Sequence, residues 1–87
     1  MRVHRFTESA AEDLAYWKKH DLKKVERIKA LLDDIKANHP RRIGKPEQLR
    51  HQKSGLWSRR IDREHRLVYS VEENTVTVYA CRYHYGR

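Results

Sequence analysis

The spacing of the apolar residues changes once along this chain, near Pro40, and this change constrains the fold more than any other feature. Before Pro40, apolar residues recur every three or four positions, as on one face of an amphipathic helix. After Pro40, they alternate with polar residues, as in half-buried strands. A helical half followed by a half made of strands predicts an α+β fold. Since 87 residues can bury only one core, we expect a single domain over residues 1–87.

The first half predicts a short extended segment and two helices. Residues 2–6 are extended, and either Thr7 or Ser9 can cap the first helix, because Ser9 and Glu12 have the spacing of a capping box. The apolar stripe of this helix consists of Ala11, Leu14, Ala15 and Trp17. Asp21 caps the second helix, which ends near residues 38–40. The apolar face of the second helix consists of Leu22, Val25, Ile28, Leu32 and Ile35.

The second half predicts an antiparallel meander. Turn-forming stretches at 54–55, 62–64 and 72–74 separate four segments with strand character. These segments are 47–51, 56–61, 65–71 and 75–84. Consecutive strands joined by tight turns pair antiparallel, and the two helices are then expected to cover one face of the sheet.

The positive charge lies mostly in the second half. The chain carries a formal net charge of +8, and the stretch 41–66 contributes +6 of it, from nine Lys and Arg against three Asp and Glu. Charge concentrated in this way favours a polyanionic partner. No apolar run approaches the roughly 18 residues of a membrane span, and there is no signal-peptide pattern. We therefore expect a cytoplasmic protein that does not bind membranes.

Metal and cofactor chemistry has little support in the sequence. Cys81 is the only cysteine, so the chain has no disulfide framework and no Cys-based zinc site. The six histidines are scattered, with no pair at the spacing of metal ligands on a helix. We expect neither a metal nor a cofactor.

The turn at residues 62–64 predicts a pair of facing arginines. If these residues form a three-residue hairpin loop, Arg60 lies directly opposite Arg66. The other face of the two strands then carries Trp57, Arg59, Leu67 and Tyr69. Like charges directly opposite each other are unfavourable unless an anion lies between them, and the arginine fork suits a phosphate. Alternatively, both side chains bend into solvent and pair with Asp62 or Glu64.

A second turn extends this face toward the end of the chain. A three-residue turn at 72–74 predicts that Ala80, Arg82 and His84 share the face of the facing arginines. A two-residue turn would put them on the other face. Glu47 arrives at the same face from the start of the preceding segment.

Glu, Arg and His side chains together can cleave RNA without a metal. A base takes the proton of the 2′-hydroxyl, cations stabilise the extra charge of the transition state, and an acid protonates the leaving 5′-oxygen. Plainer interpretations remain: Glu47 could be a solvated ion-pair partner and His84 a surface residue. Tyr83 and Tyr85 could be edge residues or platforms for stacked bases. The residues alone indicate a basic α+β domain that binds RNA, with metal-free ribonuclease activity as an open alternative.

Four stretches of the second half resemble one known family. They are residues 44–51, 54–61, 64–69 and 80–85. In order and spacing they resemble the YoeB/Txe toxins of the RelE superfamily. The first half is similar more loosely, through its strand-helix-helix pattern and the pair Tyr16-Trp17. The resemblance implies a RelE-like microbial RNase fold and the toxin of a type II toxin–antitoxin system.

The resemblance also implies an activity and assigns roles to residues. The activity is ribosome-dependent endoribonuclease cleavage of mRNA in the ribosomal A site, which inhibits translation. By resemblance, Glu47 is the general base and His84 the general acid. Arg66 contacts the scissile phosphate, with Arg60 beside it, and Tyr85 helps to shape the site.

The remaining basic residues are candidates for contacts with ribosomal RNA, of a kind that carries little sequence information. They are Arg41, Arg42, Lys45, Arg50, His51, Lys53, Arg59 and Arg63. The implied partners are the 70S ribosome with its mRNA and a cognate antitoxin of the YefM/Axe kind. An acidic C-terminal antitoxin segment would bind the basic face. A second copy of the chain is a further candidate partner.

Two other classes of function are compatible with the sequence. The first is a non-catalytic module that binds RNA or the ribosome, in which Glu47 and His84 are structural. The second is a DNA-binding repressor subunit, which fits less well because the basic residues lie on predicted strands and loops rather than on a recognition helix.

Overall fold

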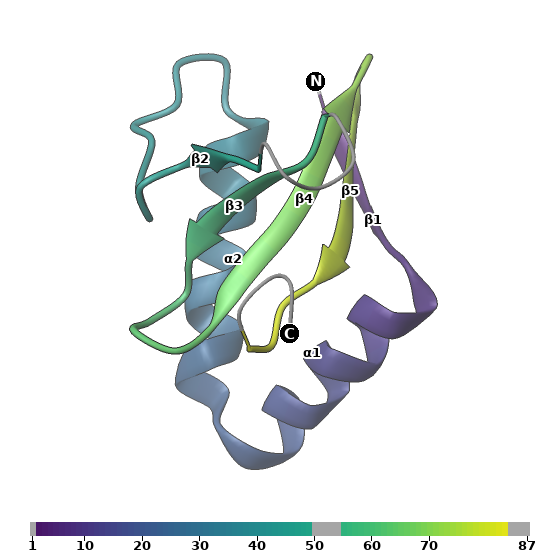
Figure 1. Cartoon of the computed structure of the whole chain (residues 1–87), viewed down its shortest axis with the longest axis vertical. Coiled ribbons are helices and arrows are strands. Elements are labelled where there is room, and N and C mark those ends of the chain that lie inside the picture. The colour runs from purple at the N-terminus through teal and green to yellow at the C-terminus, as the bar shows by residue number, and fades with distance from the viewer. Residues whose placement is uncertain (1, 50–54, 84–87) are drawn as a thin grey trace.

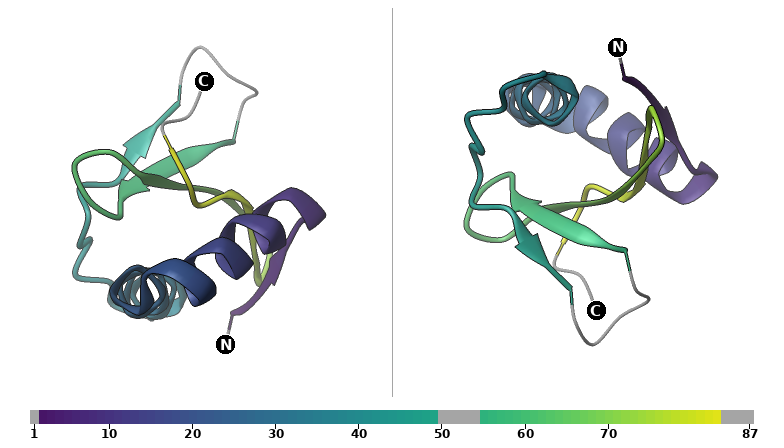
Figure 2. Two further views of the ribbon diagram at one scale, coloured as in Figure 1. Left: turned by 90° about the horizontal axis from the view of Figure 1, so that it is seen from below. Right: turned by 90° about the horizontal axis from the view of Figure 1, so that it is seen from above.

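The apolar pattern of the sequence produces one mixed sheet with both helices on the same face (Figure 1, Figure 2). The structure is a computed structural model that describes residues 2–49 and 55–83. Its elements are β1 (Val3–Phe6), α1 (Glu8–His20), α2 (Leu22–Lys36), β2 (Glu47–Gln48), β3 (Trp57–Arg60), β4 (Arg66–Glu72) and β5 (Thr75–Ala80). The strand order is β1-β5-β4-β3-β2. The α+β fold expected from the sequence is confirmed.

Four of the five strands form the expected antiparallel meander, and β1 is the addition. Strand β1 pairs parallel with β5, with Val3 opposite Thr75 and Phe6 opposite Val78. A parallel pair needs a long crossover connection. Here the intervening chain includes both helices, which cover one face of the sheet (Figure 2).

The helix starts agree with the capping residues of the sequence. Thr7, one of the two expected caps, accepts a hydrogen bond at Oγ1 from the N–H of Ala10 (3.2 Å). Asp21 caps α2 by accepting at Oδ1 from the N–H of Lys23 (3.1 Å). Each contact satisfies one backbone donor that the helix itself leaves unpaired.

The apolar stripe expected for α1 was partly wrong. Ala11 and Ala15 are exposed, whereas the buried side chains of α1 are Ala10, Asp13 and Trp17. The reason is that Asp13 accepts a hydrogen bond at Oδ2 from the N–H of Cys81 (3.0 Å), so a polar residue occupies the buried face. Hydrophobic spacing alone does not reveal such a residue.

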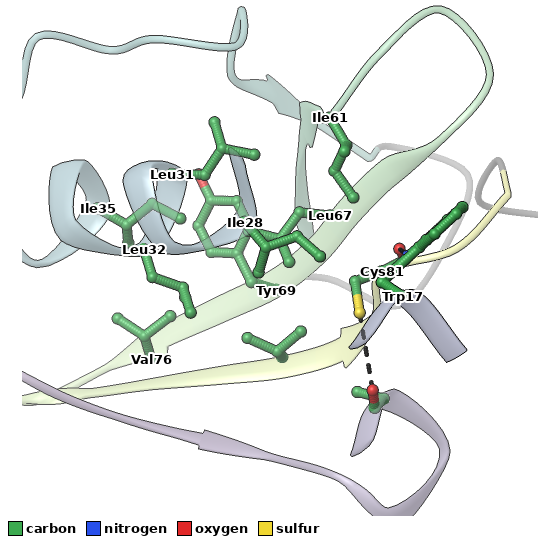
Figure 3. Packing of buried hydrophobic residues seen from close by; sticks show 12 residues of the cluster. Trp17, Ile28, Leu31, Leu32, Ile35, Ile61, Leu67, Tyr69, Val76 and Cys81 are labelled. Carbon is green, nitrogen blue, oxygen red and sulfur yellow. Dashed lines mark hydrogen bonds between the residues drawn. The ribbon is translucent and has the colours of Figure 1, made fainter. Parts of the chain in front are cut away.

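The core lies between α2 and the central strands (Figure 3). The buried face of α2 consists of Ile28, Leu31, Leu32 and Ile35. It packs against Leu67, Tyr69, Val76 and Val78 of β4 and β5. Full burial of a side chain of this size contributes about 1.5–3 kcal/mol, so this layer stabilises the packing of α2 on the sheet.

The register between β4 and β5 differs from the expected one. Glu72 pairs with Thr75, so the turn has two residues rather than three, and Glu73 in it has φ 54°. The pairing shifts between Val68 and Tyr69, because Tyr69 is opposite Val78 and Val68 is opposite Ala80. The extra residue of this bulge returns Ala80 to the face away from the helices. The expected face of Ala80 is correct, although the expected register is wrong.

A buried ion pair joins α2, the following loop and β3. Asp34 Oδ2 accepts from Arg59 Nη1 (2.6 Å), and both side chains are almost fully buried. The carboxylate also accepts from the backbone N–H groups of Arg41 (2.7 Å), Arg42 (2.8 Å) and Ile43 (3.3 Å). Burial alone would raise the pKa of Asp34, but the hydrogen bonds from Arg59, Arg41 and Arg42 hold that pKa below its ordinary value.

We predict that Asp34→Ala lowers the free energy of unfolding by roughly 3–5 kcal/mol, because it leaves the Arg59 charge buried without its partner. The matched control is Asp33→Ala at the next position, which removes an exposed pair with Lys29 (3.5 Å). That change should cost less than about 0.5 kcal/mol. Urea denaturation of both variants measures the difference, and equal midpoints would contradict the role of Asp34.

The same carboxyl predicts a dependence of stability on pH. Because the folded chain lowers the pKa of Asp34, its stabilisation is complete above the ordinary carboxyl pKa of about 3.9. It is lost as the pH falls through the lower pKa of the folded state. Asp34→Asn should therefore lose less stability than the original chain between pH 5 and pH 2, as measured by thermal unfolding across about that range.

Candidate functional site

Two arginines face each other across the hairpin of β3 and β4. Arg60 pairs directly with Arg66, and the N–H of Ile61 donates to the carbonyl of His65 (2.9 Å), which closes a three-residue loop. The facing pair expected from the loop length is confirmed. The Arg66 side chain is only 8% exposed, whereas Arg60 is exposed. One of the two guanidinium groups is therefore fixed and the other can move.

Glu47 lies beside this pair because β2 extends the sheet. Glu47 is opposite Ser58 of β3, so its side chain shares the face of Arg60, two residues further along β3. Arg66 Nη2 lies 3.4 Å from Glu47 Oε1. The Glu47 side chain is 54% exposed, so the carboxylate can exchange its arginine partner for a ligand.

These residues line a shallow pocket of about 300 Å³ on the face of the sheet away from the helices. Its lining residues are Lys45, Pro46, Glu47, Arg60 and Arg66. Three cationic side chains around one carboxylate make a site for an anion. The carboxylate supplies a group that can accept a proton from that ligand.

The loop before β2 is held in place by close packing. Gly44 has φ 79°, and a Cβ built on it would lie 2.7 Å from Leu31 Cδ2. The carbonyl of Gly44 also accepts from the N–H of Arg60 (2.7 Å). A side chain at this position would push the loop away from β3, so glycine allows Lys45 and Glu47 to reach the arginine pair.

Arg59 is buried in the fold, whereas the sequence predicted that it contacts RNA. Its guanidinium donates to Asp34, to the carbonyl of Ile43 (3.1 Å) and to Tyr69 Oη (3.1 Å), and the residue is 4% exposed. A group enclosed in this way has no surface left for a phosphate. The alternation of a strand explains the difference, since Arg59 points into the core and Arg60 points out.

The other expected RNA-binding residues divide into two groups. Arg41, Arg42 and Lys45 are exposed on the loop before β2, and Arg63 is exposed in the turn between β3 and β4. Arg50, His51, Lys53, His84 and Tyr85 lie outside the described residues.

Arg82 does not join the facing arginines, although the expected register put it on their face. Its guanidinium lies 3.5 Å from the ring centroid of Tyr16 on α1. It also donates to the Tyr83 hydroxyl (3.0 Å). The strand ends at Ala80, so the alternation of faces no longer applies at Arg82.

A further cluster, which the sequence did not predict, holds the chain after β5. Trp17 Nε1 donates to the carbonyl of Cys81 (2.7 Å), and Asp13 accepts from the N–H of the same residue. His65 Nδ1 accepts from the N–H of Tyr83 (2.6 Å). The only sequence signal for this cluster was the presence of Asp13 and Trp17 in α1. Hydrophobic periodicity cannot show that both residues bind the backbone of Cys81.

The described part of the chain has neither a metal-binding cluster nor a membrane-spanning helix. Within residues 2–49 and 55–83, no three His, Cys, Asp or Glu side chains lie close enough together to hold a metal ion. Neither helix there has the length and apolar character needed to span a bilayer.

Comparisons with known proteins agree on one family. Residues 6–85 match the family model described as the YoeB-like toxin of bacterial type II toxin–antitoxin systems. Toxin YoeB of Escherichia coli K12 is 44% identical over 80 residues, which cover 92% of this chain and 95% of that protein. Among solved structures, the YoeB dimer from Staphylococcus aureus has a TM-score of 0.89 at 42% identity and covers 97% of this chain and 98% of its own. The YoeB-YefM complex from the same organism has a TM-score of 0.86 at 41% identity, with 98% and 99% covered.

We predict that Arg60→Gln raises the free energy of unfolding by about 0.2–1 kcal/mol, because it removes one of two like charges placed directly opposite each other. The gain should shrink as salt screens the pair. Arg5→Gln is the control, since Arg5 is an exposed strand arginine opposite Thr77. Denaturation at low and high salt tests this, and a loss of stability in Arg60→Gln would show that the pair is not under repulsion.

Proposed function

Because the chain belongs to the YoeB-like toxins of bacterial type II toxin–antitoxin systems, we propose that it is a ribosome-dependent endoribonuclease that cleaves mRNA in the ribosomal A site. The observation that carries this proposal is the contact of Arg66 with Glu47 at 3.4 Å, in one pocket with Arg60 and Lys45. A proton acceptor beside several cations is the arrangement that cleavage at a 2′-hydroxyl needs.

Glu47 acts as the general base. Its exposed carboxylate takes the proton of the 2′-hydroxyl while the 2′-oxygen forms a bond to phosphorus. A phosphate that enters the pocket can take the place of Glu47 at Arg66, which frees the exposed carboxylate to accept the proton. The need for a 2′-hydroxyl restricts the reaction to RNA.

Arg66 and Arg60 stabilise the charge that builds up on the phosphate oxygens. Arg66 is suited to this role because its side chain is buried and therefore already ordered before the substrate arrives. A guanidinium can give two parallel hydrogen bonds to a phosphate, which an ammonium cannot. The electrostatic cost of the facing pair is offset when the negatively charged group lies between the two arginines.

His84 completes the reaction as the general acid. It gives a proton to the 5′-oxygen as the bond between that oxygen and phosphorus breaks, and the product carries a 2′,3′-cyclic phosphate. Tyr85 helps to shape this side of the site. Both assignments are supported by the family resemblance of the closing motif, within the matched residues 6–85.

The ribosome supplies what a shallow pocket lacks. A site of about 300 Å³ on one sheet face can grip one phosphate but cannot orient a long RNA by itself. The docking surface for ribosomal RNA consists of further basic residues. They are the exposed Arg41, Arg42, Lys45 and Arg63, together with Arg50, His51 and Lys53, which lie outside the described residues. This proposal places the protein in the cytoplasm, where ribosomes are.

An antitoxin restrains this activity. The Staphylococcus aureus relative forms a complex with YefM, and we extend this kind of partner to the present chain. The +6 charge of residues 41–66 suits an acidic antitoxin segment, which would cover the pocket and compete with RNA. A second copy of the chain is also a candidate partner, since the same relative forms a dimer.

We predict that Glu47→Gln lowers the rate of A-site mRNA cleavage by about 10²–10⁴-fold, because the amide cannot take the proton. Arg66→Gln should lower it by about 10²–10³-fold through lost charge stabilisation. The assay uses ribosomes programmed with a defined A-site codon, and Arg5→Gln is the control that keeps full activity. Equal cleavage by Glu47→Gln and the original chain would rule out Glu47 as the base. If the original chain binds ribosomes and cuts nothing, it is a non-catalytic ribosome-binding module.

We also predict that Arg41→Gln and Arg42→Gln weaken ribosome binding without changing codon preference. Each change removes one phosphate contact, so the slope of log affinity against log salt should decrease by about 1. Binding is measured over a range of salt concentrations, again with Arg5→Gln as the control. An unchanged slope would place the docking surface elsewhere on the molecule.

A further inference from the structure

Tyr83 is the last residue that the structure describes, and in the sequence it directly precedes the proposed general acid. It has φ 63°, in the left-handed region that a tyrosine seldom adopts. Such a conformation is strained for a tyrosine and persists only where the surroundings hold it. The next residue in the sequence is His84, so a fixed backbone at Tyr83 fixes the residue to which the proposed acid is joined.

Both backbone polar groups of Tyr83 are held by two consecutive residues of the hairpin. The N–H of Tyr83 donates to His65 Nδ1 (2.6 Å), and the carbonyl of Tyr83 accepts from the N–H of Arg66 (3.0 Å). Arg66 also carries the guanidinium that contacts Glu47. The backbone at the start of β4 therefore connects the phosphate-binding arginine to the segment that leads to the proposed acid.

His65 is itself held firmly. It is 8% exposed, its ring packs edge-on against Trp17 (centroids 4.7 Å apart), and its N–H donates to Asp62 Oδ1 (2.7 Å). The backbone two residues before Tyr83 is fixed as well. Trp17 donates to the carbonyl of Cys81, and Asp13 accepts from its N–H. Residues 81 and 83 are thus anchored to α1 and to the hairpin.

The hydrogen bond also assigns the protonation of the ring. Nδ1 can accept from a backbone N–H only if it carries no proton, so a neutral His65 has its proton on Nε2. A ring needed only for packing would place no requirement on this nitrogen.

We propose that His65 is a positioning residue for RNA cleavage. Its Nδ1 fixes the N–H of Tyr83, the residue that directly precedes His84 in the sequence, while the carbonyl of Tyr83 accepts from the N–H of Arg66. This inference rests on the proposed ribonuclease function, but the contact on which it depends can be measured without any activity.

Two substitutions distinguish the role of His65 Nδ1 as a hydrogen-bond acceptor from the role of the His65 ring in packing. His65→Asn places an amide oxygen near the position of Nδ1 and keeps an acceptor for Tyr83. His65→Gln places its amide near Nε2 and leaves the Tyr83 N–H without an acceptor. A packing role would tolerate the two changes similarly, whereas a positioning role requires His65→Asn to retain activity that His65→Gln loses.

The first experiment measures kcat and KM for A-site mRNA cleavage by the original chain and both variants. We expect His65→Gln to lose about 10²-fold in kcat with KM little changed, since a displacement of about 1 Å in the site has an effect of this size. His65→Asn should stay within about tenfold of the original chain. Equal loss in both variants, or no loss in His65→Gln, would overturn the proposal, provided that thermal unfolding shows both variants folded.

The second experiment records the ring nitrogen shifts of His65 and the amide resonance of Tyr83 by ¹⁵N NMR. We expect an unprotonated Nδ1 in the original chain, and a Tyr83 amide that moves strongly in His65→Gln and weakly in His65→Asn. A proton on Nδ1 would overturn the contact and the proposal with it. If the original chain cleaves no mRNA, the proposed function fails and His65 is no longer a positioning residue for it, while these shifts still decide whether His65 holds Tyr83.

Discussion

The buried ion pair of Asp34 and Arg59 is the interaction on which the arrangement of the site depends. It joins α2 to β3. The same carboxylate also anchors the loop after α2, because it accepts three hydrogen bonds from the backbone of that loop. That loop leads directly to Lys45 and Glu47, while β3 carries Arg60. A slip of β3 by one residue would exchange the faces of Arg59 and Arg60 and bury an arginine away from Asp34. The pair therefore specifies the register as well as the position of the pocket.

The pocket combines a rigid charge with mobile ones. Arg66 is buried at the start of β4, where its N–H donates to the carbonyl of Tyr83, whereas Glu47 and Arg60 are exposed around it. Two separate networks reach this point. One comes from Asp34 through the loop before β2, and the other from α1 through Trp17 and His65 to Tyr83. A small domain can thus order a charged site on the face of the sheet that lies opposite its main core.

Much of the fold could be predicted because it rests on local signals. Helical spacing and the caps Thr7 and Asp21 indicated both helices, and the turn at 62–64 was enough to place Arg60 opposite Arg66. The pairing of β1 with β5 was not predicted, since a parallel partner can lie anywhere along the chain. The bulge near Tyr69 was also missed, because one residue added to a strand leaves no clear trace in hydrophobic alternation.

The sequence by itself determined the fold class, the antiparallel hairpin with its facing arginines, and the concentration of charge between residues 41 and 66. Only the tertiary structure decided which charged and polar side chains are exposed on the surface and which are buried in the fold. Asp13, Asp34, Arg59 and His65 look like surface residues in a one-dimensional pattern, yet each is buried against a partner 10 or more residues away. The physical reason is that a buried polar group is stable only with its hydrogen-bond partner, and that partner is brought to it by the folded chain.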